Sequence, residues 1–410
     1  MHNVTRAALQ SIRYLLKHFP CVAVIGARQT GKTTLLKQVL PDGPFFDLEK
    51  TGDLDRISHD PDFFLSQFDE PIAIDEAQAL PSLFTSLRVA VDANRNKNGR
   101  FLISGSSYPA LLTHITESMA GRIAIFQLEG LSLNEAWGKP VSPLYELLIR
   151  RDVRKMLALE PRYTAKLLFE KCFFGSYPEP FLRDRRDRKL FTLWMENYTQ
   201  SYVRRDVRNL FPHMDIESYR RFIGMLAGSS GQILNYSDFA RSLDVSQPTI
   251  KSYFQIAHGT FIWRMIPSYQ KQVRKRIVKM PKGHMRDTGL LNHTMKIQDV
   301  AALHSHPLVG RIWETFVIEE LLKGFGNTLT PVEPFYYRTS NGAEIDLILE
   351  GSFGLIPFEI KLGSSVQPGK LTALEDFIQE HNLPFGIVLN NASEPARITR
   401  NILQLPVGCL

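Results

Sequence analysis

The chain has 410 residues, of which 44% are hydrophobic and 22% are charged. This composition is typical of a globular protein, and the length allows two or three domains. Its three cysteines are far apart and lack paired spacing, which argues against a disulfide framework and a zinc site. Because Arg6, Arg13 and Lys17 interrupt any apolar run near the N-terminus, we expect no signal peptide, no membrane partner and a cytoplasmic location.

The segment from Gly26 to Thr33 fits the phosphate-binding loop pattern G-x-x-x-x-G-K-[ST]. The β-branched run at residues 21–25 precedes it and predicts a buried parallel strand. Residues 34–39 follow it and predict a helix that ends before Pro41. A chance pair of glycines in an ordinary strand-turn-helix is the alternative, but this context favours ATP binding at the helix N-terminus.

Each residue type in the loop has a physical role. Glycines at positions 26 and 31 allow the backbone to approach phosphate oxygens that a Cβ atom would keep away. Lys32 reaches the β- and γ-phosphates, where it is both a binding and a catalytic residue, and the Thr33 hydroxyl is a ligand for Mg2+. The predicted nucleotide contacts from this segment are Gly26, Ala27, Arg28, Gln29, Thr30, Gly31, Lys32, Thr33 and Thr34.

A second strand with an acidic end supports this prediction. Residues 72–74 are apolar, and Asp75 and Glu76 follow them directly. Ligands gather at the carboxyl ends of strands in an open α/β sheet. We therefore expect Asp75 to hold Mg2+ and Glu76 to orient the attacking water, as in hydrolytic enzymes with this loop. The alternative is a solvated strand end.

A third strand, residues 101–104, predicts further nucleotide contacts. It leads into Ser106 and Ser107, either of which could sense the γ-phosphate, and Ser106 is included among the nucleotide-binding residues. Arg122 follows a glycine and could act on a nucleotide in its own subunit or as an arginine finger in the site of a neighbour. A plain surface arginine is the alternative reading.

The net charge of +7 is concentrated in one region. No acidic residue lies between Asp244 and Asp287, and the basic residues there are Lys251, Arg264, Lys271, Arg274, Lys275, Arg276, Lys279, Lys282 and Arg286. Such a one-sided block indicates a polyanionic partner such as DNA. A solvated basic surface is the alternative.

Residues 236–253 have the form of a helix-turn-helix. We expect Ser237 to cap a first helix that packs through Phe239, Ala240 and Leu243, and Ser246 to cap a second. In the DNA-binding version of this motif, the second helix enters a major groove. Winged-helix modules also connect proteins to each other, so this alternative stays open. The predicted nucleic-acid contacts are Gln247, Thr249, Lys251, Ser252, Lys271, Arg274, Lys275 and Arg276.

The C-terminal region contains two strand-like runs, residues 344–349 and 355–361, around a glycine-rich turn. With the turn centred after Ser352, Asp346 lies opposite Glu359, and Glu344 lies opposite Lys361. Facing carboxylates repel, so a divalent metal is the natural occupant. We predict a site with Asp346, Glu359 and Glu314 as metal ligands and Asp346, Glu359 and Lys361 as catalytic residues. This matches the D...E-x-K signature of restriction-endonuclease-like, PD-(D/E)xK nucleases, and an amphipathic hairpin with a charged face is the alternative.

Together, these motifs resemble a family of prokaryotic AAA-type ATPases that carry a C-terminal domain of unknown function with a nuclease-like core. The resemblance extends over nearly the whole chain and includes the stretches at residues 104–107, 121–122, 175–180, 202–207 and 287–290. The family usually has Lys-x-Tyr-Phe-x-Asp-Thr-Gly-Leu where this chain has Lys282-Gly283-His284-Met285-Arg286-Asp287. We therefore expect the local packing there to differ.

The predicted fold class is α/β. We expect a P-loop NTPase parallel-sheet domain at residues 1–138, a helical lid or connector at 139–230, a winged helix-turn-helix at 231–290 and an α/β restriction-endonuclease-like domain at 291–410. The favoured function is an ATPase that engages DNA and carries a metal-dependent nuclease-like domain for defence or genome processing. The expected cofactors are ATP and Mg2+. Partners other than DNA include a second copy of the chain in a homo-oligomer. The alternatives are a nucleotide-switched DNA-binding regulator with a catalytically idle C-terminal domain and a protein-remodelling ATPase.

Overall fold

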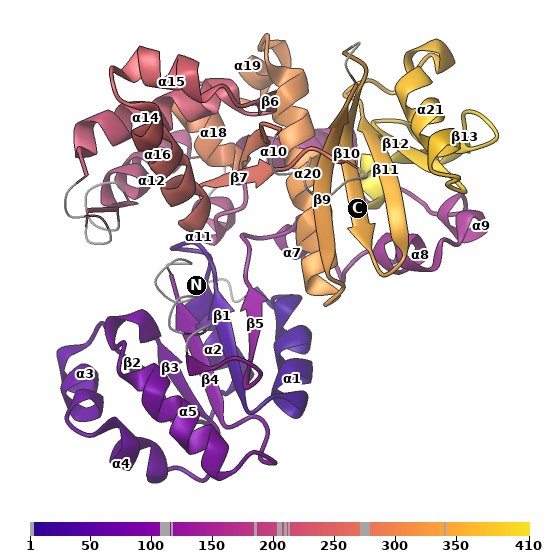
Figure 1. Ribbon diagram of the computed structural model, residues 1–410. Helices are drawn as coiled ribbons and strands as arrows, with labels where there is room; N and C mark the ends of the chain where they lie inside the picture. Colours follow the sequence, from indigo (N-terminus) through magenta and orange to yellow (C-terminus); the bar gives the residue numbers. More distant parts are fainter. Residues whose placement is uncertain are drawn as a thin grey trace. The chain divides into compact units, whose positions relative to one another are not determined.

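The computed structural model describes residues 4–106, 115, 118–183, 187–202, 207–208, 211, 214–270, 279–339 and 342–410. The chain divides into two compact units, which Figure 1 draws. Unit 1 comprises Met1–Leu131 with Gly259–Phe261, and unit 2 comprises Ser132–His258 with Ile262–Leu410. The finer division of the chain into four domains stays a prediction.

Unit 1 is built on a five-stranded parallel sheet in the order β2-β3-β4-β1-β5. This confirms the expected parallel sheet of a P-loop ATPase-like N-terminal domain. Strand β4 lies between β1 and β3, so the predicted phosphate loop and the predicted acidic pair start from strands that are not direct neighbours. The strands are β1 (Cys21–Ile25), β2 (Phe45–Asp47), β3 (Ile72–Asp75), β4 (Phe101–Gly105) and β5 (Ile123–Gln127).

Helices complete unit 1, as Figure 1 shows. Strands β1, β3 and β4 are buried along their whole length, which is typical of a parallel sheet covered on both faces. The core joins apolar side chains of these strands to Leu83, Phe84 and Leu87 of helix α5. The helices are α1 (Ala8–His18), α2 (Lys32–Val39), α3 (Thr51–Ser58), α4 (Pro61–Ser66), the 3-10 turn η1 (Ala77–Ala79) and α5 (Leu83–Ala93).

Unit 2 begins with helices, as the sequence predicts for this region. Most are short and are capped by side chains: Thr164 caps α10 and Asp215 caps α14. The helices are α7 (Leu133–Ala136), α8 (Leu144–Arg150), α9 (Val153–Met156), α10 (Ala165–Phe174), α11 (Pro178–Leu182), α12 (Arg188–Ser201) and α14 (Ile216–Ser229).

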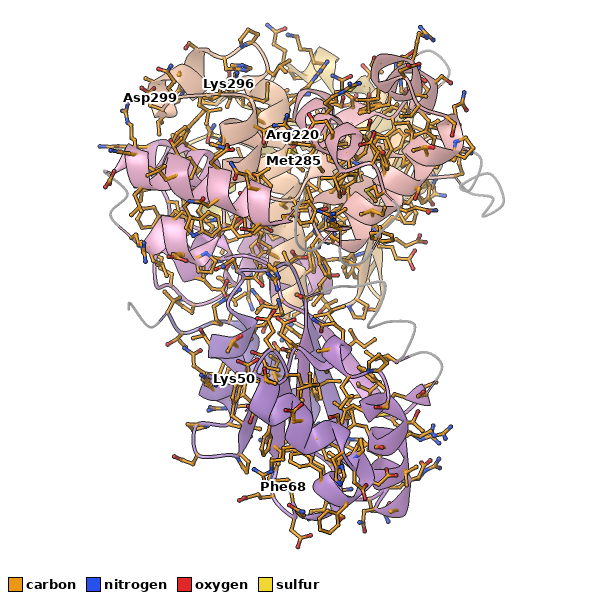
Figure 2. The ribbon with its side chains drawn as sticks, turned by 90° about the vertical axis from the view of Figure 1, so that its left-hand side faces the viewer. Lys50, Phe68, Arg220, Met285, Lys296 and Asp299 are labelled. Carbon is orange, nitrogen blue, oxygen red and sulfur yellow. The ribbon has the colours of Figure 1, made fainter. Side chains whose placement is uncertain are left out.

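A small antiparallel sheet with the order β6-β8-β7 follows. Its central strand is buried at every residue, and Met285 on that strand is fully buried, whereas Arg220 of α14 is largely exposed (Figure 2). The elements in chain order are β6 (Gln232–Ile233), α15 (Tyr236–Leu243), α16 (Gln247–Gly259), β7 (Trp263–Ile266) and β8 (Lys282–Met285).

The C-terminal part of unit 2 contains a six-stranded mixed sheet in the order β13-β14-β12-β11-β10-β9. Strands β9, β10 and β11 are antiparallel neighbours, and β12 and β14 continue the sheet in parallel with β11. Helix α21 packs against β10, β11 and β12. The strands are β9 (Val332–Arg338), β10 (Glu344–Gly351), β11 (Gly354–Ile360), β12 (Gly386–Asn390), β13 (Ala396–Arg397) and β14 (Ile402–Pro406).

The remaining elements of unit 2 flank this sheet in the chain. They are α18 (Thr288–Thr294), α19 (Val300–Ser305), α20 (Val309–Asn327), the 3-10 turn η3 (Pro368–Lys370), α21 (Thr372–Glu380) and the 3-10 turn η4 (Val407–Cys409). Helix α20 is buried on most of its surface. Among the described residues, no helix combines the length and the apolar character that crossing a bilayer requires.

Candidate functional site

The phosphate-binding loop joins β1 to α2 in unit 1, as the sequence predicts. Gly26 has no room for a side chain, because an added Cβ atom would lie 2.2 Å from the carbonyl oxygen of Leu128. Gly31 has a φ angle of +91°, a left-handed value that favours glycine. Two positions therefore need glycine for different reasons, one for close backbone approach and one for backbone conformation.

An arginine from the N-terminal segment fixes the same loop. The buried guanidinium of Arg6 donates hydrogen bonds to the carbonyl oxygen of Thr30 at 2.6 Å and to that of Glu129 at 2.7 Å. It thereby ties the loop to the chain segment after β5. The motif alone gives no sign of this contact, because Arg6 lies 24 residues before Thr30.

Lys32 is the first residue of α2, and its side chain turns back over the loop. Its Nζ donates to the carbonyl oxygens of Gly26 at 3.1 Å and Ala27 at 2.9 Å, and the residue is 5% exposed. The ammonium group thus lies among the loop carbonyls. A triphosphate offers it stronger, charged acceptors, so its side chain is available for the role that the sequence predicts.

Thr33 and Asp75 meet in the structure. The Thr33 hydroxyl donates to Oδ2 of Asp75 at 2.5 Å, and the Ser104 hydroxyl donates to Oδ1 of the same carboxylate. Asp75 is 2% exposed, and strand β3 positions it beside the start of α2. A hydroxyl and a carboxylate oxygen side by side fit the partial ligand set of Mg2+, which keeps waters and phosphate oxygens for its other positions.

Glu76 lies just beyond β3, with a left-handed φ angle of 54°. Its Oε2 accepts a hydrogen bond from the Ser106 hydroxyl at 2.9 Å and another from the side-chain amide of Gln78. The structure therefore brings Ser106, just after β4, to the acidic pair, and its role as a phosphate sensor stays a prediction. Ser107 lies outside the described residues, and sequence reasoning missed Gln78, whose only signal was a polar side chain two residues after Glu76.

Two predicted arginines have other partners. Arg28 forms an ion pair with Glu49 at 2.7 Å. Arg122 forms a bidentate pair with Asp92 at 2.7 and 2.9 Å. These contacts give both side chains structural partners within unit 1.

The predicted role of Arg122 in its own nucleotide site is wrong. Strand β5 runs parallel to β1, with Ile123 opposite Cys21 and Gln127 opposite Ile25. Arg122 precedes β5, so it lies at the edge of the sheet where these strands begin, roughly 16 Å along the strands from the loop edge at about 3.3 Å per residue. A finger role toward a neighbouring subunit stays a prediction.

In unit 2, the C-terminal hairpin has the predicted register. Gly351 pairs with Gly354, and Leu347 pairs with Phe358, so the turn is centred between Ser352 and Phe353. The Asp346 carboxylate accepts the backbone N–H of Ile360 at 2.7 Å. This two-residue connection brings Asp346 next to the Glu-x-Lys segment of β11.

A lysine that was not predicted for this site lies among its carboxylates. Nζ of Lys282 is 2.7 Å from Glu314, 2.7 Å from Glu344 and 4.0 Å from Asp346. The first residue of β8 thus fills the space between α20 and β10. In the sequence, Lys282 belongs to the basic block. Its separation from these acids along the chain gave no sign that it contacts them.

The remaining pair of the cluster is Glu359 with Lys361, whose ammonium is 2.5 Å from the Glu359 carboxylate. We call Glu314, Glu344, Asp346 and Glu359 the C-terminal carboxylate cluster, and Lys282 and Lys361 offset part of its negative charge. Burial and then the charge of Asp346 raise the pKa of Glu314 to about 8 and that of Glu359 to about 7, against the lowering effect of Lys282 and Lys361. Burial by itself lowers the pKa of Lys282, but Glu314, Asp346 and Glu344 outweigh it and hold the pKa above its ordinary value.

This arrangement does not fit the predicted Mg2+ ion. Within the part of the chain that the structure describes, no group of three or more His, Cys, Asp or Glu side chains is arranged to hold a metal. Lys282 occupies the space between the carboxylates that a metal would need, and a hydrogen bond from Ile360 takes an oxygen of Asp346. The expected metal site therefore disagrees with the geometry, because an ammonium group already provides the positive charge.

The helix-turn-helix prediction is confirmed in its helices but wrong in one cap. Helix α15 begins at Tyr236, and Asn235 caps it by accepting the backbone N–H groups of Ser237 and Asp238. Ser237 is therefore not the cap, because Asn235 lies two residues earlier with the same capping ability. Ser246 accepts the N–H of Thr249 at 3.2 Å, as predicted for the second cap.

The predicted DNA contacts of α16 lie on its solvent side. Gln247, Lys251 and Ser252 are exposed, and Thr249 is partly buried and hydrogen-bonds to the Ser246 hydroxyl at 2.8 Å. Gln247 donates to the Ser237 hydroxyl at 3.0 Å. The other four predicted contacts lie outside the described residues: Lys271, Arg274, Lys275 and Arg276.

A phosphate-binding loop between a buried parallel strand and a helix, with an acidic pair two strands away, defines unit 1 as a P-loop ATPase domain. In agreement, residues 18–137 match the family described as "AAA domain". Residues 165–301 match "Domain of unknown function (DUF8612)", and residues 309–410 match "Domain of unknown function (DUF4143)". The chain is thus an AAA-type ATPase in its N-terminal part.

Two curated relatives extend over most of the chain. They are the uncharacterized proteins Mb2031c of Mycobacterium bovis and Rv2008c of Mycobacterium tuberculosis, each 34% identical over 375 residues, which cover 90% of this chain and 77% of the relative. The chain belongs to the same family as these two proteins.

Two solved structures illustrate the similarity of the chain to known folds. The Walker-type ATPase PABY2304 of Pyrococcus abyssi has a TM-score of 0.40 at 15% identity and covers 70% of this chain and 94% of its own. The RuvB Holliday junction branch migration motor of Thermotoga maritima has a TM-score of 0.31 at 15% identity, with coverage of 67% and 95%.

Proposed function

We propose that this AAA-type ATPase hydrolyses ATP with Mg2+ at the β1–α2 loop and engages DNA through helix α16. The observation that carries the ATPase part is the contact of Thr33 with Asp75 beside the Lys32 ammonium. Lys32 binds the phosphates, Asp75 and Thr33 hold the metal, and Glu76 with Ser106 orients the attacking water. When bound, Mg2+ neutralises the charge that develops on the phosphates.

The order of elements around α16 supports the DNA part. A helix, a short strand, two helices and two strands with the sheet order β6-β8-β7 follow one another here, an order that supports a winged-helix module. In such modules the second helix of the pair reads a major groove. The exposed side chains of Gln247, Lys251 and Ser252 lie on one side of that helix, and no acidic residue follows until Asp287.

The C-terminal sheet supports a nuclease-like fold for residues 291–410. Helix α20 is followed by three antiparallel strands, a helix and a strand that runs parallel to the third. Asp346 on β10 and Glu359 on β11, with Lys361 directly after that strand, support this reading, because the D...E-x-K signature uses these residue types on neighbouring strands. This combination favours an endonuclease-like scaffold over an ordinary charged hairpin.

As to DNA cleavage, the geometry favours the alternative in which the C-terminal domain is catalytically idle. Lys282 bridges Glu314 and Glu344 and approaches Asp346, so the carboxylates already have a cation. We therefore assign the C-terminal domain a scaffolding role, and the chain is best understood as a nucleotide-dependent DNA-binding ATPase.

The first test measures ATP turnover. Lys32→Met keeps the aliphatic stem and removes the ammonium group, and we expect turnover to fall by roughly 100-fold or more, since one preorganised donor is worth about 3–4 kcal/mol in the transition state. The matched control is Lys37→Met, an exposed lysine on the same helix. Equal turnover in the two variants would refute the assigned site.

The second test measures DNA affinity by fluorescence anisotropy across a salt series. Lys251→Glu should weaken binding and reduce the salt dependence, because one phosphate contact is lost. Lys370→Glu is the control, since this exposed lysine lies far along the chain in η3. If both variants bind like the wild type while a protein partner stimulates ATP turnover, the protein-remodelling alternative replaces this proposal.

A further inference from the structure

Lys282 is an unusual lysine in this fold. Its side chain is 3% exposed, although lysine is rarely buried without a partner. It contacts acids from two elements, Glu314 on α20 and Glu344 on β10. A buried charged side chain that pairs with acids on two separate elements requires a structural explanation.

The backbone holds Lys282 firmly in place. It is the first residue of the central strand β8 and pairs with Ile233 of β6 on one side and Ile266 of β7 on the other. The small antiparallel sheet therefore supplies the cation, whereas α20 and the six-stranded sheet supply the anions. This side chain links two structural parts of unit 2 by charge.

Charge balance shows what the cation replaces. The C-terminal carboxylate cluster contains four acids, and hard divalent cations bind such oxygens at 2.0–2.6 Å. The Lys282 ammonium group lies 2.7 Å from an oxygen of Glu314 and 2.7 Å from an oxygen of Glu344, to which it donates a hydrogen bond, so it occupies the place of such a cation. The two kinds of cation compete for one space, because like charges in a buried site repel.

We propose that Lys282 is an internal counter-ion that keeps divalent metal ions out of the C-terminal carboxylate cluster. Replacing its ammonium group by a neutral side chain converts the cluster into a site for Mg2+ or Mn2+ with oxygen ligands only. The inference rests on the nuclease-like character proposed above for residues 291–410. It concerns metal occupancy, so it is tested without DNA and without cleavage.

The experiment measures Mn2+ binding to nucleotide-free protein by isothermal titration calorimetry. We expect Lys282→Gln to bind one Mn2+ ion per chain at least 10-fold more tightly than the wild type, and Asp346→Asn in the same background to abolish the gain. Lys282→Arg should behave like the wild type, because it keeps the positive charge. Lys279→Gln, an exposed lysine three residues earlier, is the matched control.

Two results would overturn the proposal. The first is wild-type protein that binds Mn2+ through Asp346 as tightly as the Lys282→Gln variant does. The second is a Lys282→Gln variant that folds and binds no Mn2+. If removal of the charge unfolds unit 2, recovery of the fold by Mn2+ supports the proposal. Without recovery, the double variant Lys282→Gln with Glu344→Gln, which removes one anion together with the cation, gives the decisive titration. A wild-type protein that neither hydrolyses ATP nor binds DNA would refute the proposed function and leave these titrations unaffected.

Discussion

Asp287 allows a stability prediction that the structure makes quantitative. Its buried carboxylate accepts the backbone N–H of Ser176 at 2.6 Å, the Ser176 hydroxyl at 2.8 Å and the N–H of Leu290 at 2.7 Å. It therefore caps α18 and also holds the turn after α10. An added Cβ atom on Gly175 would lie 2.5 Å from the same carboxylate, so the turn and the acid fit closely.

Removing this carboxylate should be costly. Loss of a helix cap costs about 1 kcal/mol, and each of the two abandoned Ser176 donors adds roughly 1–2 kcal/mol. We therefore expect Asp287→Ala to reduce the free energy of unfolding of unit 2 by roughly 3–5 kcal/mol. The loss also leaves the buried ammonium groups of Lys171 and Lys323 with Glu320 as their neighbouring acid.

Asp299 provides the matched control, since it is also a helix-capping aspartate. It accepts the N–H of Ala302 at 2.7 Å at the start of α19, but its side chain is 28% exposed (Figure 2). Asp299→Ala should cost only about 1 kcal/mol. Asp299 also pairs with Arg188 at 3.1 Å, but that contact is exposed, so the difference between the two variants isolates the buried Ser176 contacts of Asp287.

Tryptophan fluorescence during thermal unfolding measures this difference in unit 2. The chain has 4 tryptophans, and all of them belong to this unit: Trp137, Trp194, Trp263 and Trp313. At roughly 2–3 °C per kcal/mol for a unit of this size, Asp287→Ala should lower Tm by roughly 6–15 °C and Asp299→Ala by about 2–3 °C. Equal shifts in the two variants would refute the reasoning, because burial and the Ser176 contacts would then have no energetic effect.

Three further predictions concern the site and pH. Gly26→Ala should abolish ATP turnover, because its Cβ atom would lie 2.2 Å from the Leu128 carbonyl oxygen. Gly52→Ala should keep turnover, because Gly52 has open space around it. Comparable ATP turnover in the two variants would contradict the packing argument. Asp75→Asn should lower turnover by roughly 100-fold and shift the Mg2+ requirement upward, and a Mg2+ titration that matches the wild type would exclude Asp75 as a ligand. Burial, followed by nearby arginines, lowers the pKa of His258 to about 4, so the unfolded chain binds a proton more readily and stability falls as pH drops below about 6.5. The loss from pH 7 to pH 5 should be about 1–2 kcal/mol and smaller in His258→Gln, which chemical denaturation followed by tryptophan fluorescence can measure.

Local chemistry made part of this protein predictable from sequence. A phosphate loop needs glycines, a lysine and a hydroxyl at fixed spacing, so Gly26, Lys32 and Thr33 are sufficient to identify it in the chain. The register of the C-terminal hairpin was equally predictable, because a two-residue turn fixes which residues face each other. Both features depend on short stretches of chain, where backbone geometry leaves few options.

Only the tertiary structure determined how distant segments combine. The parallel pairing of β5 with β1 placed Arg122 at the edge of the sheet where these strands begin, away from the loop, although its sequence context suited an arginine finger. The choice of Asn235 over Ser237 as a cap depended on where α15 begins, since both side chains can accept the same kind of hydrogen bond. Lys282 lies 62 residues before Glu344, and no local spacing rule relates them. The sequence by itself thus determined the phosphate-binding chemistry, whereas the packing of one sheet against another decided which cation the C-terminal carboxylates receive, because that choice depends on long-range contacts.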